Sequence, residues 1–275
     1  MGKTMNDTDS KSSVIVGIDG SDTAIEAALW AIDEAVSRSV PLRLVCVTKA
    51  EHPSAEDYYA DIHHAEDSLR AAQAAVDATG KSVKVETGIL TGLPGVSLVE
   101  ESYDATLVCI GSVGIGRYAR SILGSTAIEV AEKAHCPVAI IRPFDTEADH
   151  SVNWITVADK RSRDTDALLE AAMDEAALRQ APVLVVGKNG SVERDVEALR
   201  KRHPGLRIYP IGDSADIARF LKNSDERVQL AVISGAEAHQ VADILGPYGH
   251  HRFSHAGSSV LVVRGRLVAR EEIVR

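Results

Sequence analysis

The residues best suited to chemistry are glycines and hydroxyl side chains near the middle of the chain. They are Gly111, Ser112, Val113 and Gly114 and, after nine intervening residues, Gly124, Ser125 and Thr126. Glycine lacks a Cβ and tolerates positive φ, so the backbone there can pass close to a ligand. The hydroxyl pair opens a run with helical spacing, and the free N–H groups at a helix start attract anions. The pattern predicts a phosphate-binding site and hence a nucleotide ligand.

Two better-known phosphate motifs do not fit this segment. A P-loop needs a lysine directly after its last glycine, and Gly124 is followed by Ser125 and Thr126. A dinucleotide-binding turn follows the first strand of its unit, whereas Gly111 ends what we expect to be the fourth. The motif therefore indicates a mononucleotide site of another kind.

Asp19 and two arginines are further candidate ligand contacts. Asp19 ends an apolar run and is a natural partner for a ribose hydroxyl or for adenine, although a turn or N-cap aspartate is the alternative. Arg117 and Arg120 lie between the glycines and Gly124, where they could reach the terminal phosphates or stay in solvent.

No arrangement typical of a catalytic centre is visible in the sequence. The histidines His250, His251 and His255 lack strong metal spacing and favour a surface loop. Because no general base is evident near the glycine motif, the sequence favours a binding module over an enzyme. Slow hydrolysis of the nucleotide or phosphotransfer, and a scaffold that needs no nucleotide, remain as alternatives.

Composition narrows the class of protein. A net charge of −10 argues against a nucleic-acid groove or an anionic membrane surface as partner. The chain is 45% hydrophobic but only 4% aromatic, which is typical of aliphatic α/β cores. Three cysteines without paired spacing fit a reducing compartment, and we expect a cytoplasmic protein without metal ligands among them.

Apolar runs alternate with helical patterns along the first half. We expect strands at residues 14–19, 42–47, 83–88, 107–111 and 138–141, and helices at 22–38, 55–79, 96–102 and 126–134. Such alternation predicts a parallel sheet with right-handed crossovers. Ligands of these sheets bind beyond the carboxyl ends of the strands, where the first and fourth strands would be neighbours.

The pattern then restarts, so the chain is a tandem repeat. Residues 172–176 echo residues 31–35 at an offset of 141, and residues 259–264 echo 137–142. We expect a disordered tail at 1–13, one domain at 14–143, a linker at 144–152, a second domain at 153–265 and a C-terminal tail at 266–275.

The second repeat lacks the glycine motif. Glu237 stands where Gly114 would fall, and a carboxylate there would repel phosphate. Asp159 keeps the aspartate that ends the first strand, but Lys160 and Arg161 replace Gly20 and Ser21. We therefore expect one nucleotide for each chain, bound by the first domain.

The segment from Val14 to Ser21, the run from Leu44 to Val47 and the glycine spacing together resemble the universal stress protein family. Its ATP-binding members carry G-x-x-G, nine residues and then G-S/T. The resemblance covers essentially the whole chain and is closest to the tandem, two-domain members of mycobacteria and related actinobacteria. It implies two Rossmann-like α/β domains, each a five-stranded parallel sheet flanked by helices.

The resemblance also implies a ligand and the residues that hold it. ATP, often with Mg²⁺ or Mn²⁺, would contact the backbone near Gly17, the Asp19 side chain and the backbone of Val47 at the adenine. The phosphate contacts that it implies are Gly111, Ser112, Val113, Gly114, Gly116, Arg117, Gly124, Ser125 and Thr126.

Two further implications concern partners and role. Family domains pair through their fifth strands, here from Val138 to Ile141 and from Val260 to Val263, either within one chain as a pseudo-dimer or between chains as a homodimer. Unpaired, such apolar edges would be a liability. The role implied by the resemblance is signalling or regulation in adaptation to stress or dormancy, with an unknown protein downstream.

Overall fold

The computed structural model describes residues 13–114, 123–143, 152–162, 164–212, 215–224, 226–245 and 258–264. The strands are β1 (Ser13–Ile18), β2 (Leu42–Thr48), β3 (Val85–Thr91), β4 (Ala105–Gly111), β5 (Val138–Ile141), β6 (Trp154–Asp159), β7 (Val183–Gly187), β8 (Ile208–Gly212), β9 (Val228–Ser234) and β10 (Ser259–Val263). The helices are α1 (Asp22–Arg38), α2 (Ala55–Ala78), α3 (Pro94–Glu101), α4 (Ser125–Lys133), α5 (Thr165–Arg179), α6 (Val192–Arg202), α7 (Ile217–Asn223), the 3₁₀ helix η1 (Gly235–Gln240) and α8 (Val241–Leu245).

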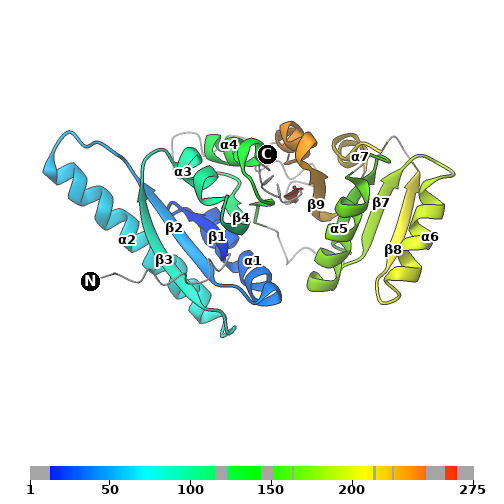
Figure 1. Cartoon of the computed structure of the whole chain (residues 1–275), viewed down its shortest axis with the longest axis horizontal. Helices are drawn as coiled ribbons and strands as arrows, with labels where there is room; N and C mark the ends of the chain where they lie inside the picture. The colour runs from blue at the N-terminus through cyan, green and yellow to red at the C-terminus, as the bar shows by residue number, and fades with distance from the viewer. Residues whose placement is uncertain are drawn as a thin grey trace, which may run out of the picture.

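All ten strands form one sheet, in the order β3-β2-β1-β4-β5-β10-β9-β6-β7-β8 (Figure 1). Neighbours are parallel within β1–β5 and within β6–β10, which confirms the predicted α/β fold of two tandem units. The two five-stranded sheets are not separate, because β5 and β10 pair antiparallel, with Leu261 opposite Ala139. This junction lies within the chain and uses the two strands that the resemblance singled out.

Two predicted elements are displaced. The strand expected at residues 83–88 begins at Val85 and runs to Thr91, since it lies at the sheet edge and its half-exposed side chains give a weak hydrophobic signal. The helix expected at 96–102 begins two residues earlier, with Pro94 in its first turn. Proline suits that position because its fixed φ is helical and its missing N–H would have no helical partner.

Capping residues at both ends determine where α1, the helix that follows the first strand, begins and ends. The Ser21 side chain caps α1 by accepting from the backbone N of Ala24 at 3.2 Å. At the other end of α1, Ser39 adopts the left-handed conformation with φ 55°. The helix therefore starts directly beside the carboxyl end of β1.

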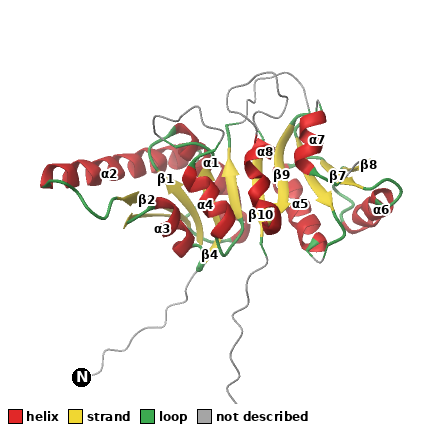
Figure 2. Ribbon diagram, turned by 90° about the horizontal axis from the view of Figure 1, so that it is seen from above, coloured by secondary structure: helices red, strands yellow, loops and turns green. Residues whose placement is uncertain are grey.

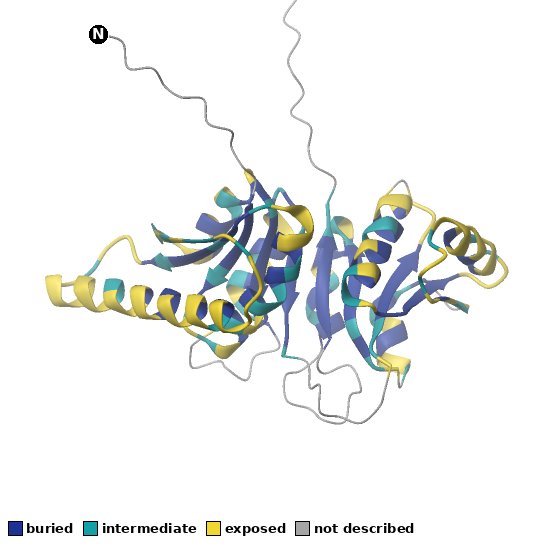
Figure 3. Cartoon of the chain, turned by 90° about the horizontal axis from the view of Figure 1, so that it is seen from below, coloured by how far each residue is buried: buried dark blue, intermediate teal, exposed yellow. Residues whose placement is uncertain are grey.

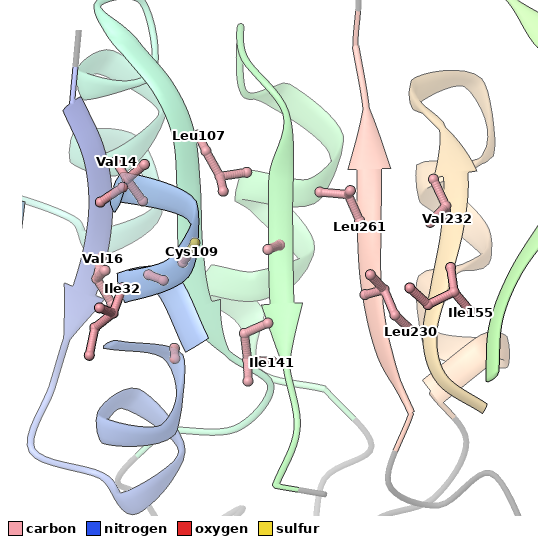
Figure 4. Close-up of a cluster of buried hydrophobic side chains, with 14 of the residues drawn as sticks. Val14, Val16, Ile32, Leu107, Cys109, Ile141, Ile155, Leu230, Val232 and Leu261 are labelled. Atoms are coloured by element: carbon pink, nitrogen blue, oxygen red, sulfur yellow. The ribbon is translucent and has the colours of Figure 1, made fainter. Parts of the chain in front are cut away.

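Helices cover both faces of the sheet (Figure 2). One core cluster joins the strands to α1, α2, α5 and α6, and a second joins them to α3, α4, α7 and α8. Alternate residues of a strand serve opposite faces, as Val14 and Val16 pack in the first cluster and Ile15 in the second. Figure 4 shows the first cluster continuing across the junction from Ile141 to Leu261, so both halves share it.

Two arginines at the ends of the junction strands reach across it reciprocally. Arg142 follows β5 and donates from Nη1 to the carbonyl of Leu245, at the end of α8. Arg264 follows β10 and donates from Nη2 to the carbonyl of Ala131, in α4. Carbonyls in the last turn of a helix lack helical donors, so each repeat completes a helix of the other.

A buried ion cluster lies at the same junction, on the face covered by α1 and α5. Glu34 accepts from Arg38 on its own helix and from Arg179 of α5, and Arg179 also pairs with Glu175 at 2.9 Å. The Arg179 guanidinium lies over the Trp30 ring, 3.8 Å from its centroid. Burial and the nearby Glu34 charge raise the pKa of Glu175 to about 7.

Glutamine at position 175 tests that buried carboxyl. Between pH 4.5 and about 7 the unfolded chain releases the Glu175 proton while the folded chain keeps it, so this group lowers the free energy of unfolding as pH rises. Glutamine does not ionise. The free energy of unfolding of Glu175→Gln, relative to that of the wild type, should therefore increase by about 1–3 kcal/mol between about pH 5 and about pH 8. Urea denaturation at each pH measures this difference.

The matched control is Asp174→Asn, which changes the exposed neighbouring residue on the same helix. It should follow the pH dependence of the wild type. A Glu175→Gln profile parallel to that of the wild type would contradict a raised pKa at this position.

Candidate functional site

A pocket of about 880 Å³ opens where β1, β2 and β4 end, between α2, α3 and the start of α4. Most of the predicted contact residues line it, namely Gly17, Asp19, Val47, Gly111, Val113, Gly114, Gly124, Ser125 and Thr126. Ser112 lies behind this wall: it is fully buried and its backbone N donates to the carbonyl of Ile141 at 2.8 Å. Gly116, Arg117 and Arg120 lie outside the described residues, as do the three clustered histidines.

Gly111 and Gly114 are required for space and not for positive φ. A Cβ at Gly111 would lie 2.8 Å from the backbone carbonyl carbon of Thr23, and one at Gly114 would lie 2.3 Å from Asp19 Oδ2. Neither glycine is among the described residues with positive φ. Their missing Cβ atoms instead allow a close approach within the protein, of Gly111 to Thr23 at the start of α1 and of Gly114 to Asp19 just before that helix.

Two hydrogen bonds fix the glycine turn against α1 and the start of α4. The Thr23 hydroxyl donates to the carbonyl of Val113, which ties the turn to α1. The backbone N of Gly124 donates to the carbonyl of Ser112 at 2.9 Å, which brings the start of α4 against the turn. The two parts of the motif therefore meet in space although residues 115–123 separate them in sequence.

The start of α4 forms one wall of the pocket. Gly124 is its N-cap and provides no side-chain capping bond. Ser125, Thr126 and Ala127 follow in the first turn and line the pocket. First-turn N–H groups have no partner within a helix, and the helix dipole adds partial positive charge there. This end of the pocket is built to receive an anion.

Asp19 has the turn role that the sequence offered as one alternative, and it also lines the cavity. Its Oδ1 accepts from the backbone N of Ser21 at 3.0 Å and from the Ser21 hydroxyl at 2.6 Å, as in a turn aspartate. Its Oδ2 lies toward Gly114 across the pocket. The carboxylate is thus positioned by its own turn and still lines the cavity.

Sequence reasoning missed the pocket residues that come from α2 and the segment before it. Lys49, Asp61 and His64 all line the cavity. Asp61 Oδ2 accepts from the backbone N of Lys49 at 2.9 Å and from His52 Nε2 at 2.8 Å, and these bonds lower the pKa of Asp61. No local signal marks Asp61, because only the packing of α2 on β2 brings it to the site.

The described residues offer no protein-made cation site. Within them, no group of three or more His, Cys, Asp or Glu side chains is arranged to hold a metal ion. Burial, and next the Asp19 and Asp61 charges, raise the pKa of the Cys46 thiol in the pocket wall to about 11. That thiol is neutral at physiological pH and is a poor nucleophile or metal ligand.

The second repeat carries an ion pair at the corresponding positions. Glu237 Oε2 accepts from the backbone N of Ser234 at 3.1 Å and from its hydroxyl at 2.7 Å, closing the start of η1. Its Oε1 pairs with Lys160 Nζ at 2.5 Å. Burial opposes ionisation of Glu237, but the bonds from Lys160 and Ser234 outweigh it and lower the pKa. The residues that replace Gly114 and Gly20 thus bind each other.

Fold and pocket define an α/β protein with a ligand cavity at the carboxyl edge of a parallel sheet. The model of the universal stress protein family matches residues 12–142. Universal stress protein Rv2624c of Mycobacterium tuberculosis is 56% identical over 261 residues, covering 92% of this chain and 96% of the relative. Universal stress protein Rv2028c of the same organism is 35% identical over 274 residues, covering 94% and 98%.

A universal stress protein from Archaeoglobus fulgidus has a similar fold in its crystal structure. Its TM-score is 0.66 at 18% sequence identity, with 93% of this chain and 96% of that chain covered. The chain belongs to the universal stress protein family, as the relatives of high identity show. Within the described residues, every helix is too short or too polar to cross a lipid bilayer.

Alanine at position 111 tests the steric account of the glycine turn. The new Cβ would overlap the backbone of Thr23, which cannot move without shifting α1. We expect Gly111→Ala to lower the free energy of unfolding by about 1–3 kcal/mol in urea titrations. Gly205→Ala is the control, because a Cβ there meets nothing within 4 Å. Equal stability of the two variants would mean that Gly111 is not constrained by space.

Proposed function

We propose that the protein binds one ATP per chain in the pocket of its first repeat and acts as a nucleotide-dependent regulatory module in adaptation to stress or dormancy. The observation that carries the proposal is the meeting of the glycine turn with the uncapped start of α4 in one cavity. Backbone N–H groups and a helix dipole bind phosphate without a basic cluster, which suits a chain of net charge −10. Membership of the family supports the proposed role.

The pocket suggests how ATP would lie. The triphosphate would take the end formed by Gly111, Gly114 and the first turn of α4. Asp19 would accept from a ribose hydroxyl, and the adenine would reach the backbone of Val47 at the end of β2. In this orientation the phosphates lie farthest from the carboxylate of Asp61, which avoids repulsion between like charges.

A divalent cation would accompany ATP through the nucleotide itself. Because the described residues supply no cluster of three metal ligands, Mg²⁺ or Mn²⁺ would be held chiefly by phosphate oxygens and water. Asp19 is the carboxylate closest to the glycine turn and could add one oxygen ligand. The cation would screen the phosphate charge from Asp19.

We propose binding rather than turnover as the activity. Asp19, the acidic group at the phosphate end, already accepts at Oδ1 from two donors of Ser21, so this oxygen is engaged by its own turn and is poorly placed to take a proton from water. Slow hydrolysis remains the competing function. Its test is ADP release by purified protein measured against the Gly114→Glu variant, and turnover well above that background would favour an enzyme.

Two further features of the proposal concern compartment and assembly. Cys46, Cys109 and Cys136 are all free and buried, which suits a reducing cytoplasm. The edges of β5 and β10, the fifth strands of the two repeats, already pair with each other within the chain. A homodimer would therefore have to form on another surface.

The variant Gly114→Glu tests the ligand and its location together. It places in the first repeat the residue type that the second repeat carries as Glu237, beside the Asp19 carboxylate. We expect wild-type protein to bind one ATP per chain by calorimetry and to release ATP on denaturation, detected by mass spectrometry. Gly114→Glu should lose at least about 100-fold in affinity through charge repulsion and lost backbone access.

The matched control is Gly205→Glu, which adds the same charge at an exposed glycine of the second repeat. It should bind as the wild type does. Absence of nucleotide and of ATP affinity in the wild type would leave the scaffold alternative, and a stoichiometry of two would refute the asymmetry between the repeats.

A further inference from the structure

The end of the pocket opposite α4 carries a carboxylate with a fixed position. Asp61 comes from the N-terminal half of α2, and its side chain is 24% exposed where it lines the cavity. Lys49 follows β2 by one residue, and its backbone N donates to Asp61 Oδ2 at 2.9 Å. Val47 lies two residues earlier, about 7 Å along an extended strand. Asp61 therefore lies beside the carboxyl end of β2, where Val47, Thr48 and Lys49 line the pocket.

A second donor restrains the same oxygen. His52 Nε2 lies 2.8 Å from Asp61 Oδ2, and the His52 side chain is only 8% exposed. The His52 ring packs edge-on against Tyr58, with centroids 5.4 Å apart and planes at 87°. With Oδ2 held by two donors from the protein, the orientation of the carboxylate is set before any ligand arrives.

We propose that Asp61 is a specificity-determining residue of the pocket, which selects purine nucleotides carrying an amino group at position 6 over those carrying a carbonyl oxygen there. This inference rests on the proposed nucleotide function and goes beyond it, because it names the group on the base that the chain reads. An ionised carboxylate only accepts hydrogen bonds. Adenine offers two N–H donors at position 6, whereas hypoxanthine and guanine offer an acceptor.

The charge of Asp61 strengthens this discrimination. The backbone N–H of Lys49 and the His52 ring favour the ionised form, and they lower the pKa of the carboxyl. Cys46, Asp19 and Asp61 all line the pocket. Burial and then the charges of Asp19 and Asp61 raise the pKa of the Cys46 thiol, so both carboxylates lie near this thiol. If a base carried a carbonyl oxygen at position 6, that oxygen and the Asp61 carboxylate would both be negatively polarised acceptors with no proton to share. Such an unpaired contact between two acceptors strongly disfavours the wrong ligand.

Inosine triphosphate is the appropriate probe, because it differs from ATP only at positions 6 and 1 of the base, where an oxygen replaces the amino group and N1 gains a proton. We expect the full-length wild-type protein to bind ATP at least about tenfold more tightly than inosine triphosphate by calorimetry. In Asp61→Asn the amide oxygen can still accept from Lys49, while the amide nitrogen can donate to a carbonyl. The preference for ATP should therefore fall to about twofold or less.

The matched control is Asp57→Asn. Asp57 precedes Asp61 by one turn of α2, is exposed and does not line the pocket. This variant removes the same charge from the same helix, so it separates local recognition from the general field. It should keep the wild-type preference for ATP. Circular dichroism should show that each variant retains its fold.

A wild type that binds the two nucleotides equally, or an Asp61→Asn variant that keeps the full preference, would overturn the role of Asp61. Should Asp61→Asn fail to fold, Asp61→Ser replaces it, because a hydroxyl can both donate and accept, and it should likewise lose the preference for ATP. If the wild type binds no nucleotide, or Gly114→Glu still binds ATP, the proposed function itself fails. The two failures are thus distinguishable.

Discussion

The antiparallel pairing of β5 with β10 is the interaction on which the rest of this structure depends. It joins two parallel sheets into one and lets a single hydrophobic core run beneath both. Because strand direction reverses at the junction, the carboxyl ends of β1–β5 and those of β6–β10 point to opposite edges of the sheet. The two repeats therefore present their ligand edges on opposite sides, and each can change without obstructing the other.

Helix α1 connects the β5–β10 junction to the pocket. That helix begins with Ser21, which holds Asp19, and with Thr23, which holds the glycine turn. Three turns later Glu34 enters the buried ion cluster with Arg179 of the second repeat. Between these points α1 buries Ala27, Ala28 and Ala31. The strands of the molecule are largely buried, whereas the helices have exposed outer faces (Figure 3). A displacement of α1 at the pocket would have to be accommodated by a charge network in which a lost partner costs several kcal/mol.

The sequence was sufficient where neighbours along the chain decide the structure. Gly111 and Gly114 were predicted from spacing, but their physical reason is the approach of Thr23 and Asp19, which no local pattern contains. Asp61 could not be predicted at all, because α2 has charged residues along much of its length and only packing selects one. Likewise, the repeat offset relates Glu34 to Glu175, yet their meeting around Arg179 follows from the β5–β10 pairing.

The second repeat shows how the fold accommodates a carboxylate, Glu237, at the position that corresponds to Gly114. Glu237 alone would place a nearly buried carboxylate in a turn, which is costly without partners. Ser234 supplies two hydrogen bonds and Lys160 supplies the opposite charge, so the substitution is compensated at each polar atom. The first repeat has Gly20 where Lys160 stands. That position therefore supplies no cation for a carboxylate at the glycine turn, and the ion pair that stabilises Glu237 has no counterpart at Gly20.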